Sequence, residues 1–275
     1  MASGLRSAAK TSLLSVLWSY DQLVNRSRNL RVAVLSYHDI ENQGRSHFTV
    51  TPGDFALQIR RIHEWGFSFL GGDEFQNVMT GPPEAQGATR VLITFDDGYQ
   101  SFETHAAPIL REVGAPAIIF VHTDRGTRQI GAEQPLLDWD AIGRARSAGF
   151  EIGNHSHSHR SFHKLSNDEI GEELDRSGAI LREKTGIVPR FFAYPGGGYE
   201  DRMEDQLAGH GYSFAFGGRQ RRAAPSSNPF NVERICVRRE TSPRQLYFAL
   251  GGALDRYDTL RHGRKIQRRG SVRLS

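Results

Sequence analysis

The stretch Arg90-Val-Leu-Ile-Thr-Phe-Asp-Asp-Gly98 decides how this chain folds. Its first six residues form a nearly continuous apolar run with the length of one β-strand, typical of a strand that is buried on both faces of a parallel sheet. Two adjacent carboxylates and a glycine follow directly. We therefore predict a central parallel strand that ends in a polar turn.

The same pattern continues on both sides of this stretch. Short β-branched or aromatic runs predict strands at 31–36, 67–70, 90–95, 116–121, 150–154, 191–194, 213–216 and 232–237. Amphipathic stretches predict helices at 52–65, 73–79, 101–113, 138–148, 166–186, 200–208 and 242–255. Because strands and helices alternate, we expect an α/β fold, an irregular (β/α) barrel of seven to eight parallel strands in a single domain, rather than an open doubly wound sheet.

Length and composition agree with one globular domain. The chain has 275 residues, of which 38% are hydrophobic and 24% are charged. These values exclude a wholly disordered, collagen-like or coiled-coil chain. The single cysteine, Cys236, cannot form an intramolecular disulfide or supply a thiolate zinc site.

The net charge of +4 is concentrated at the C-terminus. Residues 256–275 carry seven Lys or Arg against one Asp, so the rest of the chain is slightly acidic. We expect no nucleic-acid partner, because the basic character belongs to the tail and not to the domain. A solvated chain end is the simpler interpretation of this tail, and contact with anionic lipid or nucleic acid is the alternative.

The N-terminal residues 1–30 are expected to form an amphipathic helix or extension. Leu13, Leu17, Tyr20 and Val24 recur at helical spacing, and the apolar run is too short to cross a bilayer. An interfacial membrane helix and a secretory signal are the alternatives. Since no small-residue cleavage site follows, we favour a cytoplasmic or peripheral membrane location over secretion. The predicted organisation is thus an extension at 1–30, a barrel at 31–255 and a basic tail at 256–275, with peripheral membrane contact through the termini and an oligomeric state that is left open.

Titratable residues follow several of the predicted strands at their carboxyl ends. His38 follows the first strand, Asp96 and Asp97 follow 90–95, and three histidines follow 150–154. In a barrel of parallel strands these ends face one common mouth. We therefore expect these side chains to share one rim.

A metal site is the best explanation for this rim. The Asp-Asp-Gly sequence alone is compatible with an ordinary turn, and a histidine-rich segment alone is compatible with a polar loop. His155 and His159, however, have the i, i+4 spacing that brings two imidazoles to one side of a helical turn, and His163 extends that spacing. Two imidazoles and one carboxylate leave coordination positions open for catalysis, and such ligands suit Zn²⁺, with Co²⁺, Ni²⁺ or Fe²⁺ as alternatives.

Two segments together resemble a known family. Thr94-Phe-Asp-Asp-Gly98 and Glu151-Ile-Gly-Asn-His-Ser-His-Ser-His159 look like the motif pair of the polysaccharide deacetylases, the NodB-homology family or carbohydrate esterase family four. The resemblance covers roughly residues 31–250. It implies that Asp96 is the catalytic base and that the metal ligands are Asp97, His155 and His159. It also implies hydrolysis of the N-acetyl amide of amino-sugar polymers.

The third segment departs from the family's pattern. Ala193 stands where an arginine often pairs with the base, and Gly196 replaces the usual aromatic residue. The resemblance still assigns Tyr194, Pro195 and Gly196 to the substrate groove, with the Gly196 N–H as a candidate oxyanion donor. Arg234 is a candidate substitute for the missing arginine, although a surface arginine is the alternative.

The general acid is expected near the first strand. Tyr37-His38-Asp39 resembles the atypical branch of poly-N-acetylglucosamine deacetylases, which draws on an N-terminal strand, so we assign His38 as the acid. The alternative is a polar residue that shapes the rim. Trp139 is a candidate for stacking on a sugar face or, equally, an apolar anchor at a helix start.

These observations predict a metal-dependent carbohydrate N-deacetylase that acts on an N-acetylated glycan. A non-haem iron oxygenase would use similar ligands but would leave Asp96 without a role. A catalytically impaired carbohydrate-binding or scaffold protein on the same fold is the alternative. Ala193 in place of the usual arginine, and the lack of the histidine that typical members supply near the C-terminus as the acid, would also fit lost activity.

Overall fold

The structure is a computed structural model that describes residues 31–255, apart from 44–45, 82–89, 125–134, 219 and 226, together with residue 257 and a few positions before residue 20. The predicted N-terminal extension and basic tail lie almost entirely outside the described residues. Among the described helices, none combines the length and the apolar character that crossing a bilayer requires.

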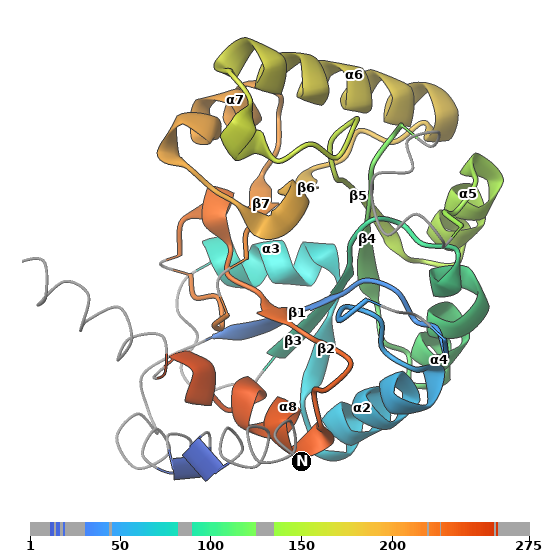
Figure 1. Ribbon diagram of the computed structural model, residues 1–275, viewed down its shortest axis with the longest axis vertical. Coiled ribbons are helices and arrows are strands. Elements are labelled where there is room, and N and C mark those ends of the chain that lie inside the picture. The colour runs from blue at the N-terminus through green and yellow to red at the C-terminus, as the bar shows by residue number, and fades with distance from the viewer. Residues whose placement is uncertain are drawn as a thin grey trace, which may run out of the picture.

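One eight-stranded parallel sheet forms the centre of the molecule, with the strand order β7-β6-β5-β4-β3-β1-β8 and with β2 paired to β3. The sheet curls into a half-barrel (Figure 1). This confirms the predicted irregular (β/α) barrel. The strands are β1 (Val32–Tyr37), β2 (Ser68–Leu70), β3 (Arg90–Phe95), β4 (Ala117–Val121), β5 (Glu151–Asn154), β6 (Phe191–Ala193), β7 (Phe214–Phe216) and β8 (Ile235–Cys236).

Four of the described α-helices, α2, α5, α6 and α8, begin where a side chain caps the first turn. Thr51 caps its helix by accepting from the N–H of Asp54, with Pro52 as the first helical residue, and Ser166 and Glu169 form a capping box. The helices are α2 (Pro52–Glu64), α3 (Gly72–Thr80), α4 (Ala107–Glu112), α5 (Trp139–Ser147), α6 (Asn167–Thr185), α7 (Glu204–Gly209) and α8 (Pro243–Leu250).

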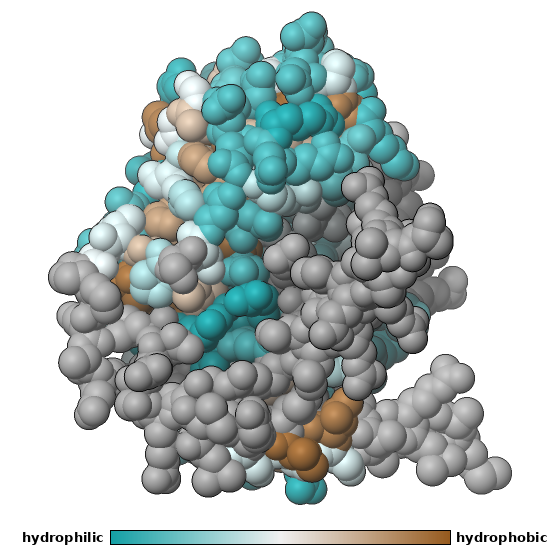
Figure 2. All heavy atoms as spheres, turned by 90° about the vertical axis from the view of Figure 1, so that its left-hand side faces the viewer, coloured by the Kyte–Doolittle hydropathy of each residue, from teal (hydrophilic) through white to brown (hydrophobic). Residues whose placement is uncertain are grey.

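The two faces of the sheet bury different layers of the core. Buried side chains of α2, α4, α5 and α8 pack against one face, and Phe75 and Met79 of α3 pack against the other, which lines the inside of the curl. Helices α6 and α7 cover the region of β6 (Figure 1). Figure 2 shows that the upper part of the molecule, where these two helices lie, is largely hydrophilic on its outer surface.

The inside of the curl changes from apolar to polar along the strands. Alternate residues of a strand point to the same face, so Val32 and Val34 lie in the apolar inner cluster and Ser36 is the next inward position. The same alternation leads from Leu92 through Thr94 to Asp96. The apolar floor and the polar mouth therefore follow from the register of the strands.

Two of the predicted elements, the helix at 101–113 and the strand at 232–237, differ in the structure from the sequence-based prediction. The expected helix 101–113 begins as a π-helical turn, Phe102–Ala106, because Pro108 has no N–H with which to continue an α-helical ladder there. The expected strand 232–237 is reduced to β8, since Val232 makes only an isolated bridge to Phe216. Arg234 consequently lies just before β8 and not within a strand.

Candidate active site

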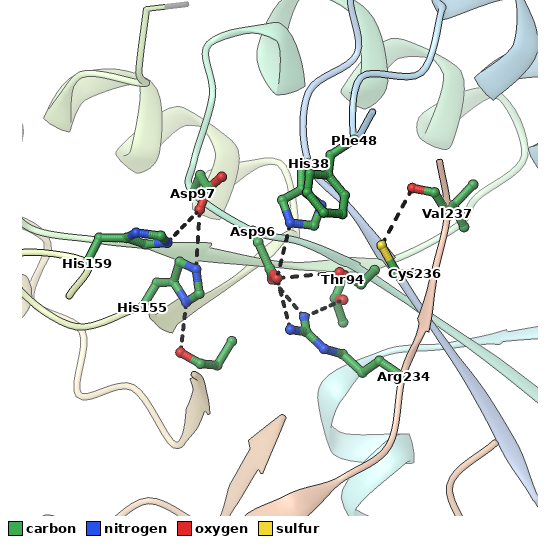
Figure 3. A network of polar contacts seen from close by, with 12 residues as sticks. His38, Phe48, Thr94, Asp96, Asp97, His155, His159, Arg234, Cys236 and Val237 are labelled. Atoms are coloured by element: carbon green, nitrogen blue, oxygen red, sulfur yellow. Dashed lines mark hydrogen bonds and ion pairs between the residues drawn. The ribbon is translucent and has the colours of Figure 1, made fainter. Parts of the chain in front are cut away.

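The two adjacent aspartates lie directly after β3 and are almost fully buried. Asp97 and Gly98 both have φ near 70°, a left-handed conformation that Asp tolerates better than most residues with a side chain. This turn separates the two carboxylates. Asp97 points toward two histidines, while Asp96 points toward Arg234 (Figure 3).

Asp97, His155 and His159 form one cluster of donor atoms. Asp97 Oδ1 lies 3.3 Å from Nε2 of His155 and 3.2 Å from Nε2 of His159. The ligand atoms of all three residues lie within 4.8 Å of one another. The structure thus brings together, from the ends of β3 and β5, the three residues that the family resemblance assigns to a metal.

Asp97 and His155 shift each other's pKa values. Burial by itself would lower the pKa of His155, but the hydrogen bond to Asp97 and the charges of both aspartates raise it above the ordinary value. Burial would likewise raise the pKa of Asp97, and its hydrogen bonds with His155 and His159 hold it well below the ordinary value. The contacts with the two histidines thus favour the ionised form of Asp97, which is the form that binds a cation.

The donor set fits a divalent transition metal. His155 donates from Nδ1 to the carbonyl oxygen of Ala193 at 2.7 Å, which directs Nε2 toward Asp97. Such a bond to the second ring nitrogen is the usual way in which a protein orients a metal-ligating histidine. One oxygen and two nitrogen donors suit Zn²⁺ and similar ions that keep free coordination positions.

Arg234 forms a bidentate ion pair with Asp96. Nη1 and Nη2 donate to the two carboxylate oxygens at 2.7 and 2.9 Å, and Nε donates to the carbonyl oxygen of Gly217 at 3.1 Å. The arginine side chain is only 4% exposed. Arg234 is thus a buried partner of Asp96 and not a surface arginine.

This pair keeps Asp96 ionised. Burial would raise the pKa of the Asp96 carboxyl, but the charge of Arg234, assisted by His155 and His38, lowers it below the ordinary value. Ser36 and Thr94 complete the surroundings, since Ser36 Oγ lies 3.4 Å from Asp96 and Nη1 of Arg234 lies 3.3 Å from Thr94 Oγ1. A buried carboxylate that carries charge and has a fixed orientation is available to accept a proton.

His38 approaches Asp96 from the end of β1. Its Nε2 lies 3.8 Å from Asp96 Oδ2. The imidazole stacks on the ring of Phe48, with 4.7 Å between centroids and 23° between planes. Arg238 lies over the same phenyl ring, with its guanidinium carbon 5.5 Å from the centroid. Burial lowers the pKa of His38 although Asp96 and Asp97 act in the opposite direction.

The histidine segment is not a helical turn, so that part of the prediction is wrong. Ser156 and His159 both have left-handed φ values, 69° and 56°, and the chain between them forms a tight loop after β5. The loop, and not helical spacing, brings the rings of His155 and His159 within 4.8 Å of each other. His163 does not join them, because its Nδ1 lies 2.7 Å from a carboxylate oxygen of Glu200 in an exposed pair.

The residues predicted to line the substrate groove differ in exposure. The side chain of Tyr194 is fully buried and its hydroxyl donates to the carbonyl oxygen of Phe230, so this side chain does not line a groove. Pro195 is buried directly after it. Gly196 adopts a φ of 71°, and the position of a Cβ there faces open space. Trp139 begins α5 and packs against the core, as an apolar anchor would.

Sequence reasoning missed two residues that support the site. Phe48 gave no signal, because an aromatic residue in a polar loop is common. Glu173 did give one, since it occupies the buried face of α6 together with Ile170 and Leu174. A carboxylate at an apolar position of an amphipathic helix indicates a specific partner, which here is the loop after β5.

Comparisons with known proteins give a consistent result. Residues 84–215 match the model of the family described as Polysaccharide deacetylase. A curated relative, the peptidoglycan-N-acetylglucosamine deacetylase of Bacillus cereus, is 23% identical over 162 residues, which cover 58% of this chain and 54% of that protein.

Solved structures share the fold over most of the chain. The deacetylase PplD of Streptococcus pyogenes in complex with acetate has a TM-score of 0.72 at 22% identity and covers 81% of this chain and 99% of its own. IcaB from Ammonifex degensii has a TM-score of 0.70 at 26% identity, with coverages of 80% and 97%.

Proposed function

We propose, from the premise that residues 84–215 form a polysaccharide deacetylase domain, that the protein is a metal-dependent hydrolase that removes N-acetyl groups from an amino-sugar polysaccharide or oligosaccharide. The observation that carries this proposal is the cluster of Asp97, His155 and His159 beside the Asp96–Arg234 pair. Similarity to the peptidoglycan-N-acetylglucosamine deacetylase of Bacillus cereus supports an N-acetylated glycan as the substrate class.

Asp97, His155 and His159 would hold the metal, for which Zn²⁺ is the first candidate. When bound, the ion supplies a Lewis acid that acidifies water and polarises the amide carbonyl. The three side chains present one carboxylate oxygen and two imidazole nitrogens toward the same point. Among the described residues three protein donors converge there, which would leave coordination positions for water and substrate.

Asp96 would act as the general base. It is held ionised by Arg234, so it can accept a proton from the attacking water without first losing one. The same pairing makes Asp96 a weak base, since its pKa is lowered. It is therefore suited to a water molecule that has been made more acidic than bulk water.

His38 would act as the general acid. An amide nitrogen must be protonated before it can leave as an amine, and His38 Nε2 lies 3.8 Å from the base, at the same reaction centre. Burial lowers the pKa of His38, so its protonated form is a stronger acid but is less populated at neutral pH than that of an ordinary imidazole. Phe48 holds the plane of the imidazole by stacking on it.

Gly196 would contribute its N–H to the developing oxyanion. Its left-handed turn, and the absence of any described heavy atom within 4 Å of a Cβ built there, support this role. Pro195 would shape the wall behind it.

Acetate release from N-acetylglucosamine oligomers tests the proposal. We expect release by the parent protein, loss of release after chelation and recovery when Zn²⁺ is added back. Asp96→Asn should bind Zn²⁺ like the parent and lose turnover by about 10²- to 10⁴-fold. His155→Ala should lose Zn²⁺ binding itself. Activity that survives complete removal of metal would refute the mechanism.

The same assay separates the alternative of an impaired carbohydrate-binding protein. Such a protein would retain oligomers on a column but release no acetate at any metal concentration. The bidentate Asp96–Arg234 pair argues for activity, because it supplies the arginine partner that the position of Ala193 lacks.

A further inference from the structure

The loop that carries His159 contains two residues in an unfavourable backbone conformation. Ser156 and His159 both occupy the left-handed region, with φ of 69° and 56°. Residues other than glycine seldom adopt this region, because their Cβ atom lies too close to the following carbonyl oxygen. Two of them within four residues need surrounding contacts that hold the loop in place.

Glu173 of α6 supplies the most concentrated of these contacts. One carboxylate oxygen, Oε2, accepts from the backbone N–H of His157 at 3.0 Å and of Ser158 at 2.8 Å. The other oxygen, Oε1, accepts from the hydroxyl of Ser158 and from Nη2 of Arg160 at 3.3 Å. A single side chain thus binds three residues around His159: His157 and Ser158 before it, with Ser158 held twice, and Arg160 after it.

The Glu173 carboxylate is buried, which strengthens its hydrogen bonds to the loop. Glu173 is 5% exposed, so its charge is compensated by the loop rather than by water. Hydrogen bonds to an ionised acceptor in such surroundings are among the stronger ones in proteins. The outward-facing residues of α6 lie on the hydrophilic upper surface seen in Figure 2, whereas Glu173 is on the buried face of the helix.

Other contacts fasten the first half of the loop. Asn154 Oδ1 accepts from the N–H of Ser156 at 2.9 Å, and Thr123 Oγ1 lies 2.8 Å from Nδ1 of His157. His155 is itself tied to Ala193. His159 is held by the bond from its N–H to Ser156 Oγ at 3.1 Å, by the contact with Asp97 and by ring contacts with His155 and His122. Its position also depends on the backbone before it, where the carbonyl oxygen of His157 accepts from the N–H of Asp124 and the N–H groups of His157 and Ser158 donate to Glu173.

We propose that Glu173 is a positioning residue for the metal ligand His159: by accepting the N–H groups of His157 and Ser158, it fixes the strained loop so that the His159 imidazole meets Asp97 and His155. This inference rests on the proposed metal-dependent function. Glu173 touches neither metal nor substrate, so its effect should appear in metal affinity before it appears in turnover.

Zn²⁺ affinity of the metal-free full-length chain, measured by competition with a chromophoric chelator, tests this role. We expect Glu173→Ala to weaken Zn²⁺ binding by about 10- to 100-fold, the usual range for residues that orient a ligand. Turnover should recover toward the parent value when Zn²⁺ is saturating. Glu172→Gln is the matched control, because it removes an exposed charge from the adjacent position of α6 and should leave Zn²⁺ affinity unchanged.

Two more variants sharpen the interpretation. Glu173→Gln keeps one oxygen that can accept both N–H groups, so its Zn²⁺ affinity should lie within about threefold of the parent, which corresponds to less than about 1 kcal/mol. Should Glu173→Ala fail to fold, Glu173→Leu gives the same readout, since leucine fills the space next to Ile170 and Leu174 without offering an acceptor.

The outcomes separate this inference from the proposed function. If Glu173→Ala or Glu173→Leu is thermally destabilised yet binds Zn²⁺ as tightly as the parent, Glu173 is only structural and the inference is overturned. If Glu173→Gln loses as much affinity as Glu173→Ala, acceptance of the two N–H groups is not the cause, and the inference fails in that form. If the parent binds no Zn²⁺, or His155→Ala binds it equally well, the proposed metal site fails as well.

Discussion

At Asp96 two requirements act against each other. As the proposed base, the residue has to be charged to accept a proton, yet it is 4% exposed, where burial favours the neutral form. Arg234 resolves this conflict by forming two hydrogen bonds and supplying one compensating charge. A buried pair of this kind becomes a liability when one partner is removed, because the other charge is left uncompensated.

Replacing Arg234 should therefore affect both stability and pH dependence. Arg234→Met should lower the free energy of unfolding by about 3–5 kcal/mol, the usual cost of breaking a buried ion pair. Because the pKa of Asp96 rises without Arg234, the acidic limb of the kcat/KM profile should move to higher pH. Arg234→Lys should show a smaller shift, since one charge remains but the two-armed contact is lost.

Zn²⁺ affinity serves as the control for these variants. Arg234 contacts Asp96, Thr94 and Gly217 and none of the three metal-ligand candidates, so Zn²⁺ should bind as in the parent. An acidic limb that stays in place in Arg234→Met would show that Asp96 does not depend on this arginine.

His38 can be tested by changing the leaving group. In His38→Ala, deacetylation of an N-acetyl amide should fall by about 10²- to 10⁴-fold, because the amine cannot leave without a proton. Hydrolysis of p-nitrophenyl acetate should be largely retained, since the phenolate needs no proton to leave. His47→Ala is the control, as it removes an exposed imidazole from the neighbouring loop. Equal losses on amide and ester would mean that His38 is not the acid.

At the scale of the elements, periodicity predicted the strands and helices well, but it could not predict the conformation of the loop after β5. The i, i+4 spacing of His155 and His159 suggested a helical turn, but the segment is a loop with left-handed residues at Ser156 and His159. Spacing along the chain reports regular structure only. The loop conformation depends on contacts with Glu173 and Asn154, which come from other elements.

The link between α6 and this loop should be visible in the pH dependence of stability. Burial would raise the pKa of Glu173, but its hydrogen bonds to Ser158 and His157 lower it below the ordinary value of 4.5. Its stabilising contribution is therefore fully present above about pH 4.5 and is lost as pH falls through the lower folded-state pKa.

Urea unfolding at several pH values, for the parent and Glu173→Gln, measures this contribution. The difference in unfolding free energy between the two proteins should be constant near neutrality and shrink below about pH 4.5. A difference that does not change with pH would mean that the ionised carboxylate is not what stabilises the loop.

At the scale of the whole molecule, metal and fold should stabilise each other. A ligand that binds only the folded state raises the unfolding free energy by about 2.7 kcal/mol at a free concentration of 100 times Kd. Because Asp97 and His155 come from different strands of the sheet, this gain should be global and appear as one cooperative shift in Tm. His155→Ala should abolish the shift, and a shift that persists in this variant would point to Zn²⁺ bound elsewhere.

The global arrangement also explains what could be anticipated from the sequence about the site. The motifs around Asp97 and His155 adjoin apolar strands, so their meeting at one rim follows from parallel topology. Arg234 could only be named as a candidate, because nothing local shows that it reaches Asp96, 138 positions earlier. Phe48 and Tyr194 depend on which way single side chains turn, and periodicity carries no information on that in loops.

The distance along the chain between Asp96 and Arg234 has a consequence for synthesis. Asp97, His155 and His159 emerge from the ribosome well before Arg234, which precedes the final strand of the sheet. A chain that ends before Arg234 would contain all three donors of the proposed metal site but would lack the guanidinium that keeps the proton acceptor charged. On the proposed mechanism, competence for hydrolysis is therefore deferred until Arg234 has been translated.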